Sequence, residues 1–145
     1  MGYTHYYTIV GWDTPEWQRA WVQLIEAVRK IIEEAKIPLS GPTQYDGKIT
    51  SVVANCDDGI YLNGIGEHAH EPFVLCEPGA WAFCKTARKP YDDVVSSILL
   101  RAWMLAPKNV DIGTDGEYDD WARARELCET LWPDESTEGF WVKLN

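Results

Sequence analysis

The sequence has no hydrophobic run long enough to cross a membrane. A membrane-spanning helix needs roughly 18–20 consecutive apolar residues, and no segment of this 145-residue chain has them. The first residues, Met1-Gly2-Tyr3-Thr4-His5-Tyr6, also lack the basic and then apolar pattern of a secretory signal peptide. We therefore expect a cytoplasmic protein that does not associate with membranes.

Cysteine is scarce and is not arranged for a structural metal site. None of the cysteines forms a C-x-x-C pair, which disfavours a zinc knuckle, and a cytoplasmic setting favours free thiols. The four cysteines of the chain are Cys56, Cys76, Cys84 and Cys128. A chain of about 150 residues buries enough surface to fold without disulfides or metal. We expect a single domain over residues 1–145 with no metal and no cofactor.

Positive charge is also in deficit. Thirteen Lys and Arg face 23 Asp and Glu, which gives a formal net charge of −10. A field of this sign repels nucleic acid, so we expect no direct nucleic-acid binding. An acidic inhibitor that mimics nucleic acid stays an alternative, although the alternating charges Glu26/Lys30 and Arg29/Glu33 give one helix a mixed surface.

Motifs of common enzymes and metal sites are missing. The chain has no glycine-rich phosphate loop and no paired His-x-Thr motif. His68 and His70 could share a strand face, but no third ligand stands at motif spacing, so we interpret them as a polar turn. Cys84 lies beside basic residues that could lower its pKa, yet Arg88 is too close in sequence for a phosphatase loop. We therefore predict no catalytic residues.

Tryptophan and tyrosine are abundant. There are eight Trp and seven Tyr against three Phe, and both side chains combine a large apolar ring with a polar group. Such a surplus fits either a stacking surface or a tryptophan-rich core, and the core is the more common use.

Hydrophobic patterns predict an α+β fold with the order β-α-β-β-β-β-α-α and Phe140-Trp141-Val142 as a candidate closing strand. We expect a mostly antiparallel sheet of four to six strands with three helices packed on it. The predicted strands are 3–10, 48–55, 60–65, 71–76 and 81–86, and the helices are 14–36, 90–106 and 117–132. The acidic run from Asp111 to Asp120 lacks calcium-loop spacing and is interpreted as a capped helix start.

The first helix has the clearest pattern. Thr14 is a typical N-cap, and Pro15 follows at the first helical position. Apolar residues then recur at three- and four-residue spacing, which predicts a buried face. They are Trp17, Trp21, Leu24, Val28, Ile31 and Ala35.

Basic residues concentrate at one place in this acidic chain. Lys85, Arg88 and Lys89 fall within five positions, between a predicted strand and the N-terminus of a predicted helix. Cations, the Thr86 hydroxyl and the unpaired amides of a helix N-terminus can together bind phosphate or carboxylate. The alternative is a solvated loop whose cations pair with neighbouring acids.

The motifs Met1-Gly2-Tyr3-Thr4-His5-Tyr6, Leu62-Asn63-Gly64 with Glu71-Pro72-Phe73, and 83–92 (FCKTARKPYD) resemble a family of uncharacterised small proteins of bacteriophages and bacteria. The resemblance covers roughly residues 1–120. It implies a phage or bacterial cytoplasmic protein, and no particular activity. It also suggests that the first strand and the Asn-Gly strand meet the basic motif in one sheet.

These observations favour a module that binds and sequesters a phosphate-bearing, nucleotide-like ligand, and the resemblance suggests a host immune signalling nucleotide. Tyr3 and Tyr7 share a strand face and could stack on a base. The expected ligand-binding residues are Tyr3, His5, Tyr7, Asn63, Lys85, Thr86, Arg88, Lys89 and Tyr91. The main alternative is a nucleotide-processing enzyme with His5 as general base. The sequence leaves a homo-oligomer open.

Overall fold

The first sheet is built around β1 (Thr4–Ile9), whose side chains alternate between a buried and an outer face. The computed structural model describes residues 2–77 and 82–144. In it, Tyr3, His5 and Tyr7 are buried on one face, as the alternation predicts. β1 pairs antiparallel with β5 (Ala82–Lys85) on one side and β6 (Val110–Thr114) on the other. This gives the strand order β5-β1-β6.

A second antiparallel sheet has the order β2-β3-β4. The predicted α+β class with antiparallel strands is therefore confirmed, but the strands form two sheets and not one. The strands of the second sheet are shorter than predicted: β2 (Val53–Asn55), β3 (Gly59–Leu62) and β4 (Phe73–Leu75). Asp57 and Asp58 form the turn between β2 and β3, and Gly59 follows with a positive φ of 84°. The 3₁₀ turn η1 (Gly66–His68) lies between β3 and β4.

Helix α1 (Pro15–Ala35) matches the predicted range 14–36 to within one residue at each end. The Thr14 hydroxyl accepts a hydrogen bond from the Trp17 amide, and Lys36 ends the helix in the left-handed conformation with φ 56°. All six predicted apolar positions are buried. The periodic spacing and the cap therefore suffice to define this element.

The C-terminal third differs from the prediction. Helix α2 (Asp92–Leu105) starts two residues after Pro90, and η2 (Tyr118–Trp121) leads into α3 (Ala122–Leu131). Strand β6 was not predicted, because we assigned Asp111 and its neighbours to a helix start. The predicted closing strand is instead part of α4 (Glu138–Leu144), in which Phe140 packs on the Trp103 and Trp121 rings.

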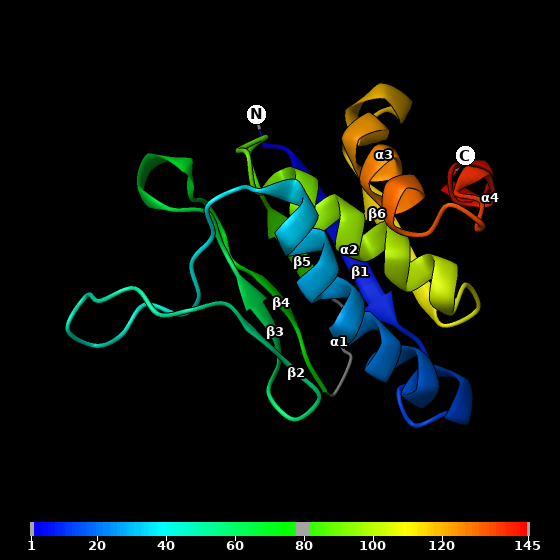
Figure 1. The fold of residues 1–145 in the computed structure, drawn as a ribbon, viewed down its shortest axis with the longest axis horizontal. Coiled ribbons are helices and arrows are strands. Elements are labelled where there is room, and N and C mark those ends of the chain that lie inside the picture. The colour runs from blue at the N-terminus through cyan, green and yellow to red at the C-terminus, as the bar shows by residue number, and fades with distance from the viewer. Residues whose placement is uncertain (1, 78–81, 145) are drawn as a thin grey trace.

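One cluster of buried apolar side chains joins both sheets and all four of these helices. Figure 1 shows α1 and α2 side by side across β1, with β2, β3 and β4 to one side and α3 and α4 to the other. The buried tryptophans of this core are Trp12, Trp17, Trp21 and Trp121. Within the described residues, no helix is long and apolar enough to cross a membrane.

Candidate functional site

A buried polar network lies directly beneath the basic motif. His5 of β1 is 0% exposed, and its Nε2 lies 2.7 Å from Oδ1 of Asp92, the first residue of α2. The Thr86 hydroxyl donates to the same carboxylate oxygen at 2.6 Å, and the Ser96 hydroxyl lies 3.5 Å from Oδ2. Asp92 therefore ties β1, the end of β5 and the start of α2 together.

The hydrogen-bond pattern assigns the His5 tautomer. Thr114 Oγ1 accepts from the Gly116 amide at 2.9 Å and from Trp121 Nε1 at 3.3 Å, which uses both of its acceptor positions. Its hydroxyl proton is then free to donate to His5 Nδ1 at 2.9 Å. We assign the tautomer in which Nε2 carries the proton and donates to the Asp92 carboxylate. Both ring nitrogens of His5 therefore have hydrogen-bond partners, and the buried ring is not accessible to a substrate.

The basic motif forms a tight turn with two residues in the left-handed region. Ala87 has φ 53° and Arg88 has φ 60°, and the Lys89 amide donates to the Thr86 carbonyl. Positive φ at both central residues is the pattern of a type I′ turn. The Thr86 and Ala87 amides both donate to the Tyr3 carbonyl, which holds the turn against β1.

This turn places the Arg88 guanidinium over the Tyr3 ring, 4.1 Å from its centroid. Arg88 also pairs with Asp120 from η2, and 60% of its side chain stays exposed. The pKa of Asp120 is lowered, first by the hydrogen bond from the Glu117 amide and then by Arg88. The Tyr3 ring therefore orients the Arg88 guanidinium, and the Asp120 carboxylate balances its charge.

The other motif segments meet around Glu71. The Lys85 amide donates to the Glu71 carboxylate, and the Tyr91 hydroxyl donates to the Glu71 carbonyl. Asn63 hydrogen-bonds the backbone of His70, whose Nδ1 lies 2.8 Å from the Lys85 carbonyl oxygen. The segments are therefore neighbours, but they belong to two sheets and not to the single sheet that we expected.

The amides at the start of α2 are already engaged. Asp92 N donates to the Lys89 carbonyl, Asp93 N to the Pro90 carbonyl and Val94 N to the Tyr91 carbonyl. The Asp92 carboxylate itself stands in the first turn, where a negative charge is favoured. Any anion at this end of α2 would therefore meet the cationic side chains of the turn before it meets helix amides.

A cavity of about 260 Å³ opens beside the motif. It lies between the chain after α1, the loop after β3 and the segment that enters α2. Its lining residues are Ile37, Pro38, Gly64, Ile65, His68, Pro90 and Tyr91. We call it the Pro90 cavity. Of the predicted site residues, Tyr91 lines it, while Asn63 and Lys89 precede lining residues in the chain.

Several predicted site residues lie inside the protein. Tyr3 and Tyr7 are 4% and 2% exposed, so both rings belong to the core in this conformation. Thr86 is fully buried on Asp92. Burial raises the pKa of Cys84 to about 12, which contradicts the hypothesis that nearby cations lower it.

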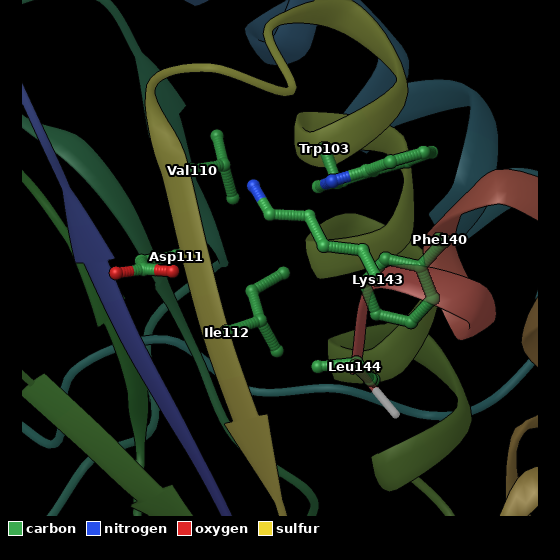
Figure 2. A pocket seen from close by; sticks show the side chains of 7 residues that line it. All are labelled: Trp103, Val110, Asp111, Ile112, Phe140, Lys143 and Leu144. Atoms are coloured by element: carbon green, nitrogen blue, oxygen red, sulfur yellow. The ribbon is translucent and has the colours of Figure 1, made fainter.

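A second, smaller cavity of about 100 Å³ lies between β6, α2 and α4 (Figure 2). Its lining residues all follow the basic motif in the sequence. Val110 and Ile112 point into it, whereas Asp111 points to the other side of β6. Lys143 covers it and donates to the Pro107 carbonyl at 3.0 Å. None of the predicted site residues lines this cavity.

No protein family matches the chain, and neither a curated protein nor a solved structure is significantly similar to it. The resemblance to small phage and bacterial proteins therefore stays a prediction from the motifs. Ile65, His68 and Pro90 line the Pro90 cavity but were not among the predicted ligand-binding residues. The sequence features that could have indicated them are the dipeptides Ile37-Pro38 and Asn63-Gly64, which are typical of loops and lie in the two loops that border the cavity.

Proposed function

We propose that the protein binds and holds a phosphate-bearing, nucleotide-like ligand, with the ring of the ligand in the Pro90 cavity. The observation that carries the proposal is the cavity beside a cationic turn. Its lining is apolar apart from His68 and the polar groups of the backbone and Tyr91, which suits the flat face of a heterocycle. A volume of about 260 Å³ is large enough for a purine-sized ring.

The phosphate end of the ligand would meet the turn that leads into Pro90. Lys89 is half-buried and adjacent to the cavity in the chain, and Arg88 is exposed with a planar group that fits phosphate. Phosphate would compete with Asp120 for Arg88, and the Tyr3 ring would keep the guanidinium in place. Lys85 at the end of β5 is the third cation of the motif.

Binding without chemistry is favoured over catalysis by the state of the candidate reactive groups. His5 is fully buried, and both ring nitrogens have protein partners. Cys84 is also buried, and its high pKa keeps it as a thiol. Neither group can reach a ligand in the Pro90 cavity unless β1 or β5 moves.

The resemblance to phage proteins suggests sequestration of a host nucleotide signal as the biological use. Calorimetric titration of cyclic dinucleotides and ADP-ribose derivatives tests this. Arg88→Ala should weaken binding about tenfold or more, because a charge-assisted pair to phosphate is lost. Arg88→Lys should restore part of the affinity. Arg123→Ala, which removes another surface arginine paired with a carboxylate, should leave binding unchanged.

A second pair of variants tests the cavity. Ile65→Trp adds a large side chain to the lining and should abolish binding, whereas the same substitution at the exposed Ile49 should not. If none of these nucleotides binds, or if all variants bind them equally, the proposal is wrong. Steep loss of affinity for a basic partner protein with added salt would then support the acidic-inhibitor alternative.

A further inference from the structure

The most deeply buried cation of the described chain lies away from the basic motif. Arg101 on α2 is 6% exposed, and its guanidinium stacks 4.0 Å from the centroid of the Trp132 ring. Its Nη1 donates to Glu135 at 2.8 Å. A buried cation held by a ring and a carboxylate has a fixed orientation, so its remaining donors point in a defined direction.

Those remaining donors have no hydrogen-bond partner among the residues that the structure describes. Arg101 Nε is buried without a hydrogen bond to any described residue, and Nη1 alone among the guanidinium nitrogens donates within that part of the chain. The Nε–H and Nη2–H groups lie on one edge of the guanidinium and together match the two oxygens of an oxyanion. A buried donor without an acceptor is unfavourable, which favours occupation of this edge.

A cavity of about 130 Å³ adjoins this side chain. It lies between α1 and the C-terminal end of α3 and is open to solvent through exposed α1 residues. Its lining residues are Gln23, Glu26, Ala27, Lys30, Arg101 and Trp132. We call it the Arg101 cavity. Lys30 and the Gln23 amide add donors to those of Arg101.

The charges around the Arg101 cavity nearly cancel. Lys30 and Arg101 are opposed by Glu26 in the lining and by Glu135 on the far side of the guanidinium. A doubly charged group such as phosphate would be repelled by two carboxylates, whereas one negative charge can be placed between the two cations. The balance therefore favours a single carboxylate group over phosphate.

We propose that the Arg101 cavity is a binding site for a small carboxylate, held two-pronged by the Nε/Nη2 edge of Arg101 and by the Lys30 ammonium. This site is independent of the nucleotide-binding proposal, because it shares no residue with the Pro90 cavity or the cationic turn. Its ligand class is also different. The small volume restricts the bound portion to a carboxylate and a few further atoms.

Titration of ¹⁵N-labelled protein with sodium acetate, at constant ionic strength adjusted with chloride, tests the proposal. Saturable shifts of the Arg101 Nε–H and Trp132 indole signals are expected with acetate, and inorganic phosphate should bind about tenfold more weakly. Lys30→Ala should weaken acetate binding several-fold without unfolding the protein, because Lys30 is exposed. Lys48→Ala, which removes an exposed lysine in a distant loop, is the matched control.

Shifts that stay linear in acetate, or that are equal in Lys30→Ala and wild type, would overturn the site. Tighter binding of phosphate than of acetate would overturn its assignment to a carboxylate. Arg101→Lys adds a second check, because it keeps the charge but removes the two-pronged edge. Retained acetate affinity in a folded Arg101→Lys protein would contradict the proposed geometry.

Discussion

Removal of the Asp92 carboxylate is the perturbation whose cost can be worked out most fully from the structure. In Asp92→Ala, the buried Nε2–H of His5 and the buried hydroxyl of Thr86 both lose their acceptor. Each unsatisfied buried donor costs about 1–3 kcal/mol. The buried position of Asp92 leaves little room for water to replace it. The two donors together predict a loss of about 2–6 kcal/mol in the free energy of unfolding.

The isosteric variant Asp92→Asn should cost much less. Its side-chain oxygen can still accept from His5 and Thr86, and its amide can donate to the Ser96 hydroxyl. Only the charge assistance of the two short bonds is lost, so a cost of about 1–2 kcal/mol is expected. The difference between the two variants separates the loss of acceptors from the loss of charge.

Urea unfolding followed by tryptophan fluorescence measures both values, because eight Trp residues report on the fold. A cost below about 1 kcal/mol for Asp92→Ala would refute the network, since it would mean that water or another group satisfies His5 and Thr86. A cost for Asp92→Asn equal to that of Asp92→Ala would contradict the tautomer assignment. Nitrogen chemical shifts of His5 should also report the Nε2–H form.

Three further predictions follow from the packing and the backbone. Leu24→Ala, at a fully buried position of α1, should lower the free energy of unfolding by about 2–5 kcal/mol, measured in the same urea assay. Ala87→Gly should raise it by about 1 kcal/mol, because glycine removes the strain of φ 53°. Iodoacetamide at mildly alkaline pH should label the two exposed cysteines and spare Cys84 and Cys128, whose pKa burial raises to about 12, so mass spectrometry should count two adducts before unfolding and four after.

Local sequence signals predict the elements whose pattern is strong over many residues. The Thr14-Pro15 start and the regular apolar spacing define α1, and the alternation of Tyr3, His5 and Tyr7 defines the buried face of β1. In both cases the residues that decide the structure are neighbours in sequence. The predictions that failed depend on packing between distant segments.

The C-terminal region illustrates this limit. Val110, Ile112 and Thr114 alternate as a strand does, but Asp111 and Gly113 between them weaken the pattern, and pairing with β1 across about a hundred residues stabilises the strand. The residues from Phe140 are also suited to a strand, yet the Trp103 and Trp121 rings hold Phe140 in a short helix. Tertiary contacts override local preference in both segments.

The candidate site was predictable only in part. The sequence indicated a cationic segment at the start of α2, because three basic residues stand together in an acidic chain. It could not indicate that Asp92 bonds His5, 87 residues away, or that Arg101 stacks on Trp132. No spacing rule connects such pairs, and their side chains meet only in the packed fold.

The central claim is that the protein holds an intact nucleotide-like ligand in the Pro90 cavity. Native mass spectrometry of protein purified from cells that produce nucleotide signals tests it most directly. We expect wild-type protein to retain one small anion with the mass of an intact nucleotide, and Ile65→Trp protein to appear without it. Bare protein in both samples, a cleaved product in place of the intact nucleotide, or equal retention by the two proteins would contradict the account.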